Sequence, residues 1–414
     1  MKKTLALVGM AVSAMAGGAE LRVLDLQRAI DAAPLHGTVL VPAGDWEVKP
    51  FRLKSDMALC IEKGAHVYAT TNLADYASGE GERTFISAVD ATNLTVCGKG
   101  VFFGRGDAFK ERAGMTGEAQ PQALPVMMRF TRCRNLRLED FTYRDGGAWG
   151  CHLRNCDGVR MRRVTCFNHI NKTNDGIDIE SCNVVIDDCD IDADDDAIVL
   201  KSESDRSFAV TNVIIRNSRL ASSWNAFKFG TGSYGDFRSV RVENCLFDRP
   251  KGNYRFDWKT QFADRGVRED LTGLGGIAIE VVDGGRLEDV VIRNIDMKGY
   301  MVPIFIRLAR RHGATDPRGS YLRGILIENV RGECATSRNG CSITGVPGLR
   351  PSDITLRNVS LVFPGGGTEA ERGLDVPELE RAYPEGVMFG RNLPAWGFYL
   401  RHADDVVFDN VRLT

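Results

Sequence analysis

The chain has 414 residues, 43% of them hydrophobic and 26% charged, and its formal net charge at pH 7 is −2. This length is ample for one large core, and a single elongated repeat domain can reach it. A nearly neutral chain without a long basic run argues against nucleic acid as a partner. The 44 glycines and only 14 prolines indicate many turns rather than disorder.

Residues 1–19 have the pattern of a secretory signal peptide. Two lysines precede the apolar stretch Leu5–Val12, and a small-x-small cleavage site follows at Ala14–Ala16. The apolar stretch is too short to span a membrane, and no later run is long enough. We therefore expect a secreted or periplasmic protein without a membrane partner.

The mature chain opens with a short amphipathic helix, LQRAIDAA, within residues 21–33. The following segment, 37–70, alternates apolar and polar residues with period two and is broken by Gly and Asp, which predicts short strands. The helix would cover the open end of a β core, whose edge would otherwise stay unpaired.

A repeat then runs to the C-terminus in the frame polar-apolar-x-apolar-x-Asn. Its copies begin at Asn135, Gly158 (a weaker copy), Asn183, Asn212, Ser239, Asp289, Gly324, Asp353 and Asp405. The sixth position is usually Asn or Asp, residues that tolerate the left-handed backbone conformation and whose amides can bond along a ladder. Short strands with such corners predict an all-β fold, a parallel β-helix, as one domain over residues 20–414.

Two loop insertions interrupt the repeat, near 249–275 and 363–396. Loops on a rigid β-helix commonly build substrate grooves. Their aromatic residues are Tyr254, Trp258 and Phe262 in the first insertion and Tyr383, Phe389 and Trp396 in the second. We expect most of these rings simply to pack the loops onto the coils.

The eleven cysteines are an odd number. Four of them lie in alternating apolar stretches and are expected to be small buried residues: Cys166, Cys182, Cys189 and Cys245. Cys334 and Cys341, in a loop that contains glycine, are the best candidates for a disulfide. No spacing matches a zinc site, and we expect neither a metal nor a cofactor.

The segment 173–202 carries the candidate chemistry. It contains two similar pieces, each with carboxylates at a bend before an apolar run: Asp175 in the first, Asp195 and Asp196 in the second. If successive coils stack, these carboxylates meet on one surface, where they could act as acid and base on a glycosidic bond. The alternative is that residues 190–197 form a solvated turn or a calcium-binding loop.

These motifs resemble the polygalacturonase family of glycoside hydrolases (family 28) over nearly the whole mature chain. Residues 173–176 match its Asn-Thr-Asp-Gly motif and 194–196 its Gly-Asp-Asp motif. The resemblance implies a right-handed β-helix that hydrolyses a polysaccharide or oligosaccharide. It implies Asp195 as general acid, with Asp175 and Asp196 activating water in an inverting mechanism that needs carboxylates about 6.5–9.5 Å apart. Crowded carboxylates should also repel one another. The pKa of one of them should then lie above its usual value, so that this group keeps its proton.

The chain departs from the family at two motifs. Asn225 stands where the Gly-His-Gly segment has its His, and 278–280 reads Ala-Ile-Glu in place of Arg-Ile-Lys. A basic pair that would hold a galacturonate carboxylate is therefore missing. Glu280 would repel such a carboxylate by a few kcal/mol at low effective dielectric. We expect a neutral sugar there, with Glu280 accepting hydrogen bonds from its hydroxyls or acting as a further catalytic carboxylate.

Five other residues are candidates for substrate binding. Lys228, Lys201 and Arg307 could bind an acidic or sulfated unit from another direction, or could each form a salt bridge with a neighbouring carboxylate. Trp224 could stack on a sugar face, or pack a loop. His169 could replace the missing His, although a single His is more often structural.

Two other classes of function remain open on the same scaffold. A polysaccharide lyase or epimerase would need a basic residue to remove a proton, often with calcium, and a lyase releases unsaturated products that absorb ultraviolet light. A non-catalytic β-helix, either carbohydrate-binding or structural, would keep its ligand but show no turnover that depends on Asp195.

Overall fold

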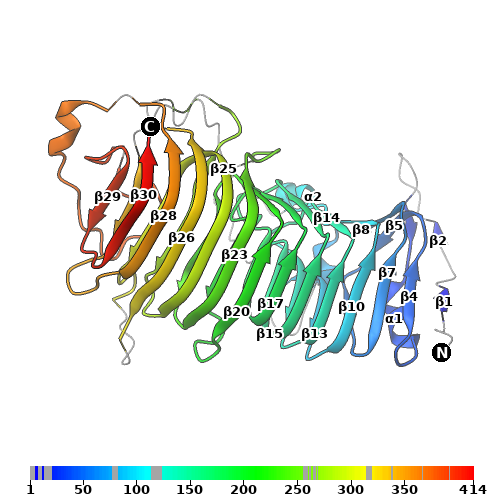
Figure 1. The fold of residues 1–414 in the computed structure, drawn as a ribbon. Helices are drawn as coiled ribbons and strands as arrows, with labels where there is room; N and C mark the ends of the chain where they lie inside the picture. The colour runs from blue at the N-terminus through cyan, green and yellow to red at the C-terminus, as the bar shows by residue number, and fades with distance from the viewer. Residues whose placement is uncertain are drawn as a thin grey trace.

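The computed structural model describes residues 5–7, 12–13, 21–76, 83–112, 124–254, 260, 263, 267, 269–313, 319–336, 339–365, 367–390 and 392–414. Short parallel strands wind into one long solenoid, with the N- and C-termini at opposite ends (Figure 1). The predicted right-handed parallel β-helix is confirmed. Within the described ranges, no helix has the length and apolar character needed to cross a membrane.

The strands of the described residues stack in three columns. The first, called the site sheet, contains β6 (Phe51–Leu53), β9 (Thr84–Val89), β12 (Val126–Thr131), the starts of β15 (Cys151–Arg162) and β17 (Ile177–Asp187), β19 (Ile198–Ser202), β22 (Asn225–Ser233), β24 (Gly273–Val281), the end of β25 (Arg286–Leu308), β27 (Cys341–Thr344) and β29 (Phe398–Arg401).

The second column, the repeat sheet, carries the repeat found in the sequence. It contains β1 (Leu5–Leu7), β4 (Thr38–Val41), β7 (Met57–Ile61), β10 (Thr92–Gly98), β13 (Arg134–Glu139), the ends of β15 and β17, β20 (Val210–Arg216), the starts of β23 (Asp236–Asp248), β25, β26 (Tyr321–Cys334) and β28 (Ser352–Val362), and β30 (Val406–Leu413).

The third column closes each coil. It contains β3 (Arg22–Val23), β5 (Gly44–Val48), β8 (Ala65–Ala69), β11 (Val101–Phe103), β14 (Thr142–Arg144), β16 (Thr165–Asn168), β18 (Asp190–Ala193), β21 (Arg219–Ser222) and the later parts of β23, β25, β26, β28 and β30. The short β2 (Val12–Ser13) pairs antiparallel with β3.

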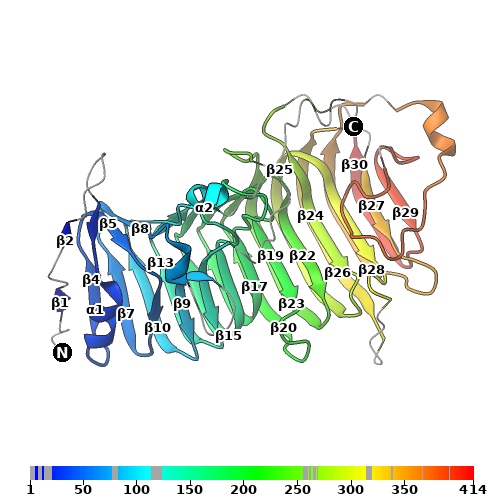
Figure 2. The ribbon, with the colours of Figure 1, turned by 180° about the vertical axis from the view of Figure 1, so that it is seen from behind.

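Apolar side chains fill the inside of the solenoid in stacks that run from coil to coil. In the repeat sheet one such stack is Val184, Val213, Val240, Val290, Ile325 and Ile354, paired in register and all at most 2% exposed. Because each residue covers the one before it, the core is continuous along the axis. Figure 2 shows the same succession of coils from behind.

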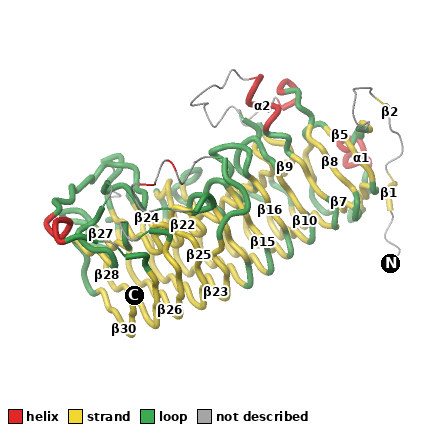
Figure 3. The backbone as a smooth tube through the Cα atoms, turned by 90° about the horizontal axis from the view of Figure 1, so that it is seen from above, coloured by secondary structure: helices red, strands yellow, loops and turns green. Residues whose placement is uncertain are grey.

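The corners of the repeat have the backbone that the sequence predicts. In the copy that begins at Asn183, φ is 55° at the first position and 57° at the sixth, Asp188. The sixth-position amides bond to one another along the solenoid, with Asn294 donating to Asn244 at 2.9 Å and Asn329 to Asn294 at 3.0 Å. Figure 3 shows the successive coils lying one behind the other along the solenoid.

The predicted helix α1 (Leu26–Ala32) covers the N-terminal coil. Asp25 caps it by accepting a hydrogen bond from the Arg28 backbone N–H, and Leu26 and Ile30 are buried against the core. Three other short helical segments occur in the described chain: α2 (Asp107–Arg112), η1 (Leu73–Tyr76) and η4 (Glu369–Gly373).

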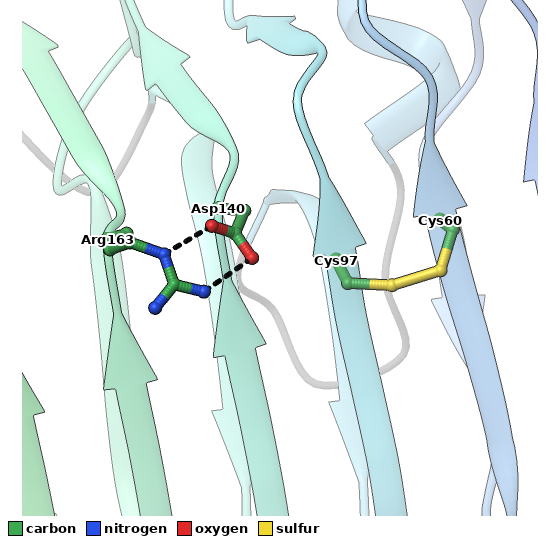
Figure 4. The surroundings of a disulfide bond; sticks show 4 residues. All are labelled: Cys60, Cys97, Asp140 and Arg163. Carbon is green, nitrogen blue, oxygen red and sulfur yellow. Dashed lines mark hydrogen bonds and ion pairs between the residues drawn. A yellow bond between two sulfur atoms is a disulfide. The ribbon is translucent and has the colours of Figure 1, made fainter.

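The disulfide prediction was wrong. The bridge joins Cys60 of β7 to Cys97 of β10, which are direct partners in neighbouring coils (Figure 4), whereas Cys334 and Cys341 are free. Direct register puts the two side chains on the same outer face of adjacent strands. Four free cysteines behave broadly as expected, since Cys166, Cys189 and Cys245 are buried and only Cys182 is partly exposed.

The left-handed corner conformation can be tested at Asn329, whose φ is 54°. Asn329→Ala should destabilise the protein by more than Asn329→Gly, by about 1 kcal/mol, because alanine adopts the left-handed conformation at a cost that glycine avoids. Both variants lose the hydrogen bonds to Asn294 and Asn358. Urea denaturation midpoints measure the difference, and equal midpoints for the two variants would contradict the conformational explanation.

Candidate active site

Two turns that lead into the site sheet bring the candidate catalytic residues together. Asp175 lies two residues before β17, and Asp196 lies two residues before β19, its neighbour in register. The Gly176 N–H donates to the Asp196 carbonyl at 2.9 Å, and the Asp195 N–H to the Asn174 carbonyl at 3.2 Å. The three aspartates therefore meet at one place from adjacent coils.

A buried amide fixes the first turn. Asn174 is fully buried, and its side chain donates to the carbonyls of Gly146 at 3.0 Å and Ala148 at 2.8 Å. Its oxygen accepts from the backbone N–H groups of Ile170 and Asn171. With all these bonds made, the backbone on either side of Asp175 has little freedom to move.

Lys201 links Asp175 to a carboxylate that the sequence reading missed. Its Nζ lies 3.7 Å from Asp175 Oδ2 and 3.3 Å from Oδ1 of Asp178, which is fully buried. The period-two pattern contained the signal, because Ile177 and Ile179 point into the core and the residue between them must point outward. Asp178 therefore lies on the same outer face as Asp175.

Lys228 makes a matching link on the other side. Its Nζ lies 3.2 Å from Asp196 Oδ2 and 3.8 Å from Glu280 Oε2. The Asn225 amide donates to Asp196 Oδ1 at 2.7 Å. Asn225, Lys228 and Glu280 are therefore all inside the cluster, and each of the two lysines bridges two carboxylates. Asp195 differs from Asp175 and Asp196, which are 3% exposed, in being partly open to solvent.

Burial and mutual repulsion set the protonation of this cluster. Burial raises the pKa of Asp175 well above its ordinary value, and the charges of Asp178 and Asp195 raise it further. Burial also raises the pKa of Asp178, against the opposing charge of Lys201. The Asp175–Asp178 pair is therefore one part of the cluster that retains a proton as the pH rises.

The pKa values of Lys201, Lys228 and Glu280 are all raised, but for different reasons. Burial alone would lower the pKa values of Lys201 and Lys228, but the surrounding carboxylates more than reverse this, so both values lie well above normal. Burial, with the charges of Asp196 and Glu385, raises the pKa of Glu280 to about 8 against the opposing charge of Lys228. Both lysines thus remain cations, while Glu280 is largely neutral at pH 7.

Three other residues that were predicted to bind substrate contact other parts of the protein. His169 Nε2 lies 2.7 Å from Asp192 Oδ1, and its Nδ1 lies 3.5 Å from Oδ1 of Asp194, the residue before Asp195. Trp224 is 8% exposed and packs in an apolar cluster with Val267, Leu274, Ala278, Met301, Val302 and Phe305, so its ring faces are covered. Arg307 donates to the carbonyls of Glu378 and Gly345, and thereby anchors the second insertion.

The second insertion covers the site sheet beyond Glu280. Phe389 packs over Arg307, as expected for these aromatics, with the guanidinium carbon 5.4 Å from the ring centroid. Tyr383 is different: it is 47% exposed, accepts a hydrogen bond from Thr231 and has Lys228 Nζ 5.7 Å from its ring centroid. It is a neighbour of the cluster that no local sequence signal indicated.

The remaining aromatics of the insertions differ in position. Trp396 contacts Phe363 at the C-terminal coil, with ring centroids 5.4 Å apart, and is 44% exposed. Tyr254 is 49% exposed and lies beside the cluster, because its backbone N–H donates to Oδ1 of Asp194, the residue before Asp195. Trp258 and Phe262 fall outside the described residues.

The carboxylates gathered just before adjacent strands of a parallel β-helix suit a carbohydrate-active enzyme, and the comparisons with known proteins agree. Residues 33–247 match the family model described as glycosyl hydrolases family 28, and the chain belongs to that family. A probable polygalacturonase of Arabidopsis thaliana is 24% identical over 76% of this chain and 72% of its own length. An endo-polygalacturonase of Pectobacterium parmentieri is 24% identical, with coverage of 81% and 83%.

Solved structures support the fold. The family 28 exopolygalacturonase of Yersinia enterocolitica superposes with a TM-score of 0.71 at 16% identity, over 98% of this chain and 78% of its own. The polygalacturonase of Erwinia carotovora gives 0.53 at 16% identity, over 95% and 92%.

The raised pKa of Glu280 predicts a pH-dependent loss of stability. The folded protein holds a proton on Glu280 up to about pH 8, whereas the ordinary pKa is 4.5. This contribution to stability is present below pH 4.5 and is lost as the pH rises through 8. Glu280→Gln cannot ionise, so its melting temperature should rise relative to wild type between pH 5 and 9.

The control is Glu369→Gln, because that side chain is 87% exposed. Its melting temperature should run parallel to that of the wild type across the same pH range. If the Glu280→Gln curve is parallel as well, Glu280 does not hold a proton in the folded protein.

Proposed function

We propose that this member of family 28 is an inverting hydrolase that cleaves a polysaccharide or oligosaccharide with a neutral sugar at the cleavage site. The observation that supports it most is the meeting of Asp175, Asp195 and Asp196 from adjacent coils. Lys201 bridges Asp175 to Asp178, and Lys228 bridges Asp196 to Glu280. Asp195, the partly exposed member, is assigned as general acid that protonates the leaving oxygen. Asp175 and Asp196, one coil apart, flank the position of the attacking water. Because Asp175 shares a retained proton with Asp178, Asp196, which faces Lys228 and the Asn225 amide, is the carboxylate that accepts the proton of the water.

The charge balance argues for a neutral sugar. Lys228 already faces Asp196 and Glu280, and Lys201 already faces Asp175 and Asp178. A substrate carboxylate that displaced Asp196 from Lys228, or the Asp175–Asp178 pair from Lys201, would leave a buried charge uncompensated. Glu280, neutral over much of the physiological range, can instead exchange hydrogen bonds with sugar hydroxyls.

A lyase or epimerase is less well supported by the same residues. Such a reaction needs a base that removes a carbon-bound proton. Lys201 and Lys228 have pKa values well above normal because carboxylates surround them, so neither is available as a neutral amine.

We infer that the protein is exported. The apolar stretch Leu5–Val12 behind two lysines supports this. The Cys60–Cys97 bridge adds support, because disulfides persist mainly in oxidising compartments.

The function is tested with a panel of neutral polysaccharides, oligogalacturonides and aryl glycosides. Wild type should release reducing ends from a neutral glycan. Asp195→Asn should lower kcat by about 10²–10⁴, the usual contribution of general acid–base catalysis, without weakening binding. Asp296→Asn, which changes an exposed aspartate in the third-column part of β25, is the matched control and should keep full activity.

Three outcomes would contradict parts of this proposal. Rapid turnover of oligogalacturonides would contradict the assignment of a neutral sugar to the cleavage site. Products that absorb ultraviolet light would indicate a lyase. Full activity in Asp195→Asn would contradict the assignment of Asp195 as the general acid.

A further inference from the structure

Trp149 lies beside the catalytic cluster without being part of the family motifs. It immediately precedes the β15 coil, and its indole is partly exposed. Lys201 Nζ lies 4.4 Å from the centroid of its ring, and the same ammonium lies 3.7 Å from Asp175. One lysine therefore separates this indole from a candidate catalytic carboxylate.

The indole is held in place by a buried polar network. The ring of His152 meets it edge-on, with centroids 5.2 Å apart and planes at 89°. Arg129 Nε donates to His152 Nδ1 at 3.1 Å, so His152 donates from Nε2 to Glu180, 2.8 Å away. Because Arg129, His152 and Glu180 are all nearly buried, Trp149 rests on a rigid support.

The pairing of the strands places Trp149 relative to the cleavage site. β15 precedes β17 in the site sheet, and His152 pairs directly with Asp178. Neighbouring strands lie about 4.8 Å apart, a step similar to the length of one pyranose unit. A glycan along the axis with one sugar at Asp175 and Asp195 would thus place its next sugar in the Trp149 coil.

Sugars offer flat C–H faces to aromatic rings, and an indole that is already fixed loses little entropy on binding. We propose that Trp149, with the Lys201 ammonium against its ring, forms a sugar-binding subsite one coil before the catalytic aspartates. It takes the stacking role first expected of Trp224, whose ring is covered. This inference rests on the proposed function for its choice of ligand, a neutral glycan.

Affinity electrophoresis tests the subsite separately from catalysis. The intact protein and its Trp149→Ala variant, both in the Asp195→Asn background, are run through gels containing galactan, arabinan or xylan. We expect at least one glycan to retard the parent protein, with the retardation reduced about tenfold in Trp149→Ala. Trp149→Phe should restore part of it, since it keeps an aromatic face. Trp396→Ala, which removes an exposed indole at the C-terminal coil, should migrate like the parent.

Equal retardation of Trp149→Ala and parent, or no retardation of the parent by any of the three glycans, overturns the subsite. Thermal melting of each variant guards against misfolding, and Trp149→Phe provides the decisive comparison if Trp149→Ala does not fold. Binding that depends on Trp149 without hydrolysis by the wild type would retain the subsite and reject the proposed function. Hydrolysis with binding unaffected by Trp149 would do the reverse.

Where a cleaved glycan is found, kinetics add a second readout. Trp149→Ala should raise KM about tenfold and change kcat less than twofold, because a stacked neighbouring sugar contributes similarly to the ground and transition states. A fall in kcat with unchanged KM would place Trp149 in a structural role instead.

Discussion

Direct register between successive coils is the constraint on which the site depends. The Asn and Asp corners with positive φ let every coil turn at the same point, and the inward apolar stacks hold the coils in line. Asp175, Asp196 and Asn225 then occupy equivalent places in three consecutive coils. A shift of one residue in any of these strands would send an entire side-chain row to the other face and dissolve the cluster.

Within that frame, the chemistry is governed by the balance of buried charge. Carboxylates at such close quarters repel one another, and an isolated buried carboxylate is costly. The two lysines compensate this by each facing a pair of carboxylates, Lys201 on one side and Lys228 on the other. The family's basic pair at residues 278 and 280 is absent, and one of its positions carries Glu280, so the cations here serve the protein's own acids. This is the physical reason to expect a substrate different from plain galacturonate.

Much of the fold could be read from the sequence because it is written in a short-range repeat. The copies beginning at Asn183 and Asn212 specify the strand, the corner and the coil length together, and the helix before them has an ordinary amphipathic pattern. The two acidic turns were equally accessible, since one coil separates them along the chain.

Contacts between segments that lie far apart in the sequence could not be predicted in this way. Tyr383 contacts Lys228 from an insertion more than a hundred residues further along the chain. No sequence pattern near either residue predicts this contact. Cys60 and Cys97 pair only because their strands are in register. The sequence made Trp224 a candidate for sugar stacking, but the ring packs in an apolar cluster with Val267 of the first insertion and residues of later coils. Asp178, in contrast, could have been found from strand alternation alone.

The central claim is that aspartates from adjacent coils act on opposite sides of one glycosidic bond with a water between them. Proton NMR of a cleaved glycan during the first minutes of reaction tests it most directly, before mutarotation mixes the anomers. Inversion at the anomeric carbon of the new reducing end is the expected result. Retention of configuration would mean that one carboxylate attacks the sugar itself, and would contradict the account.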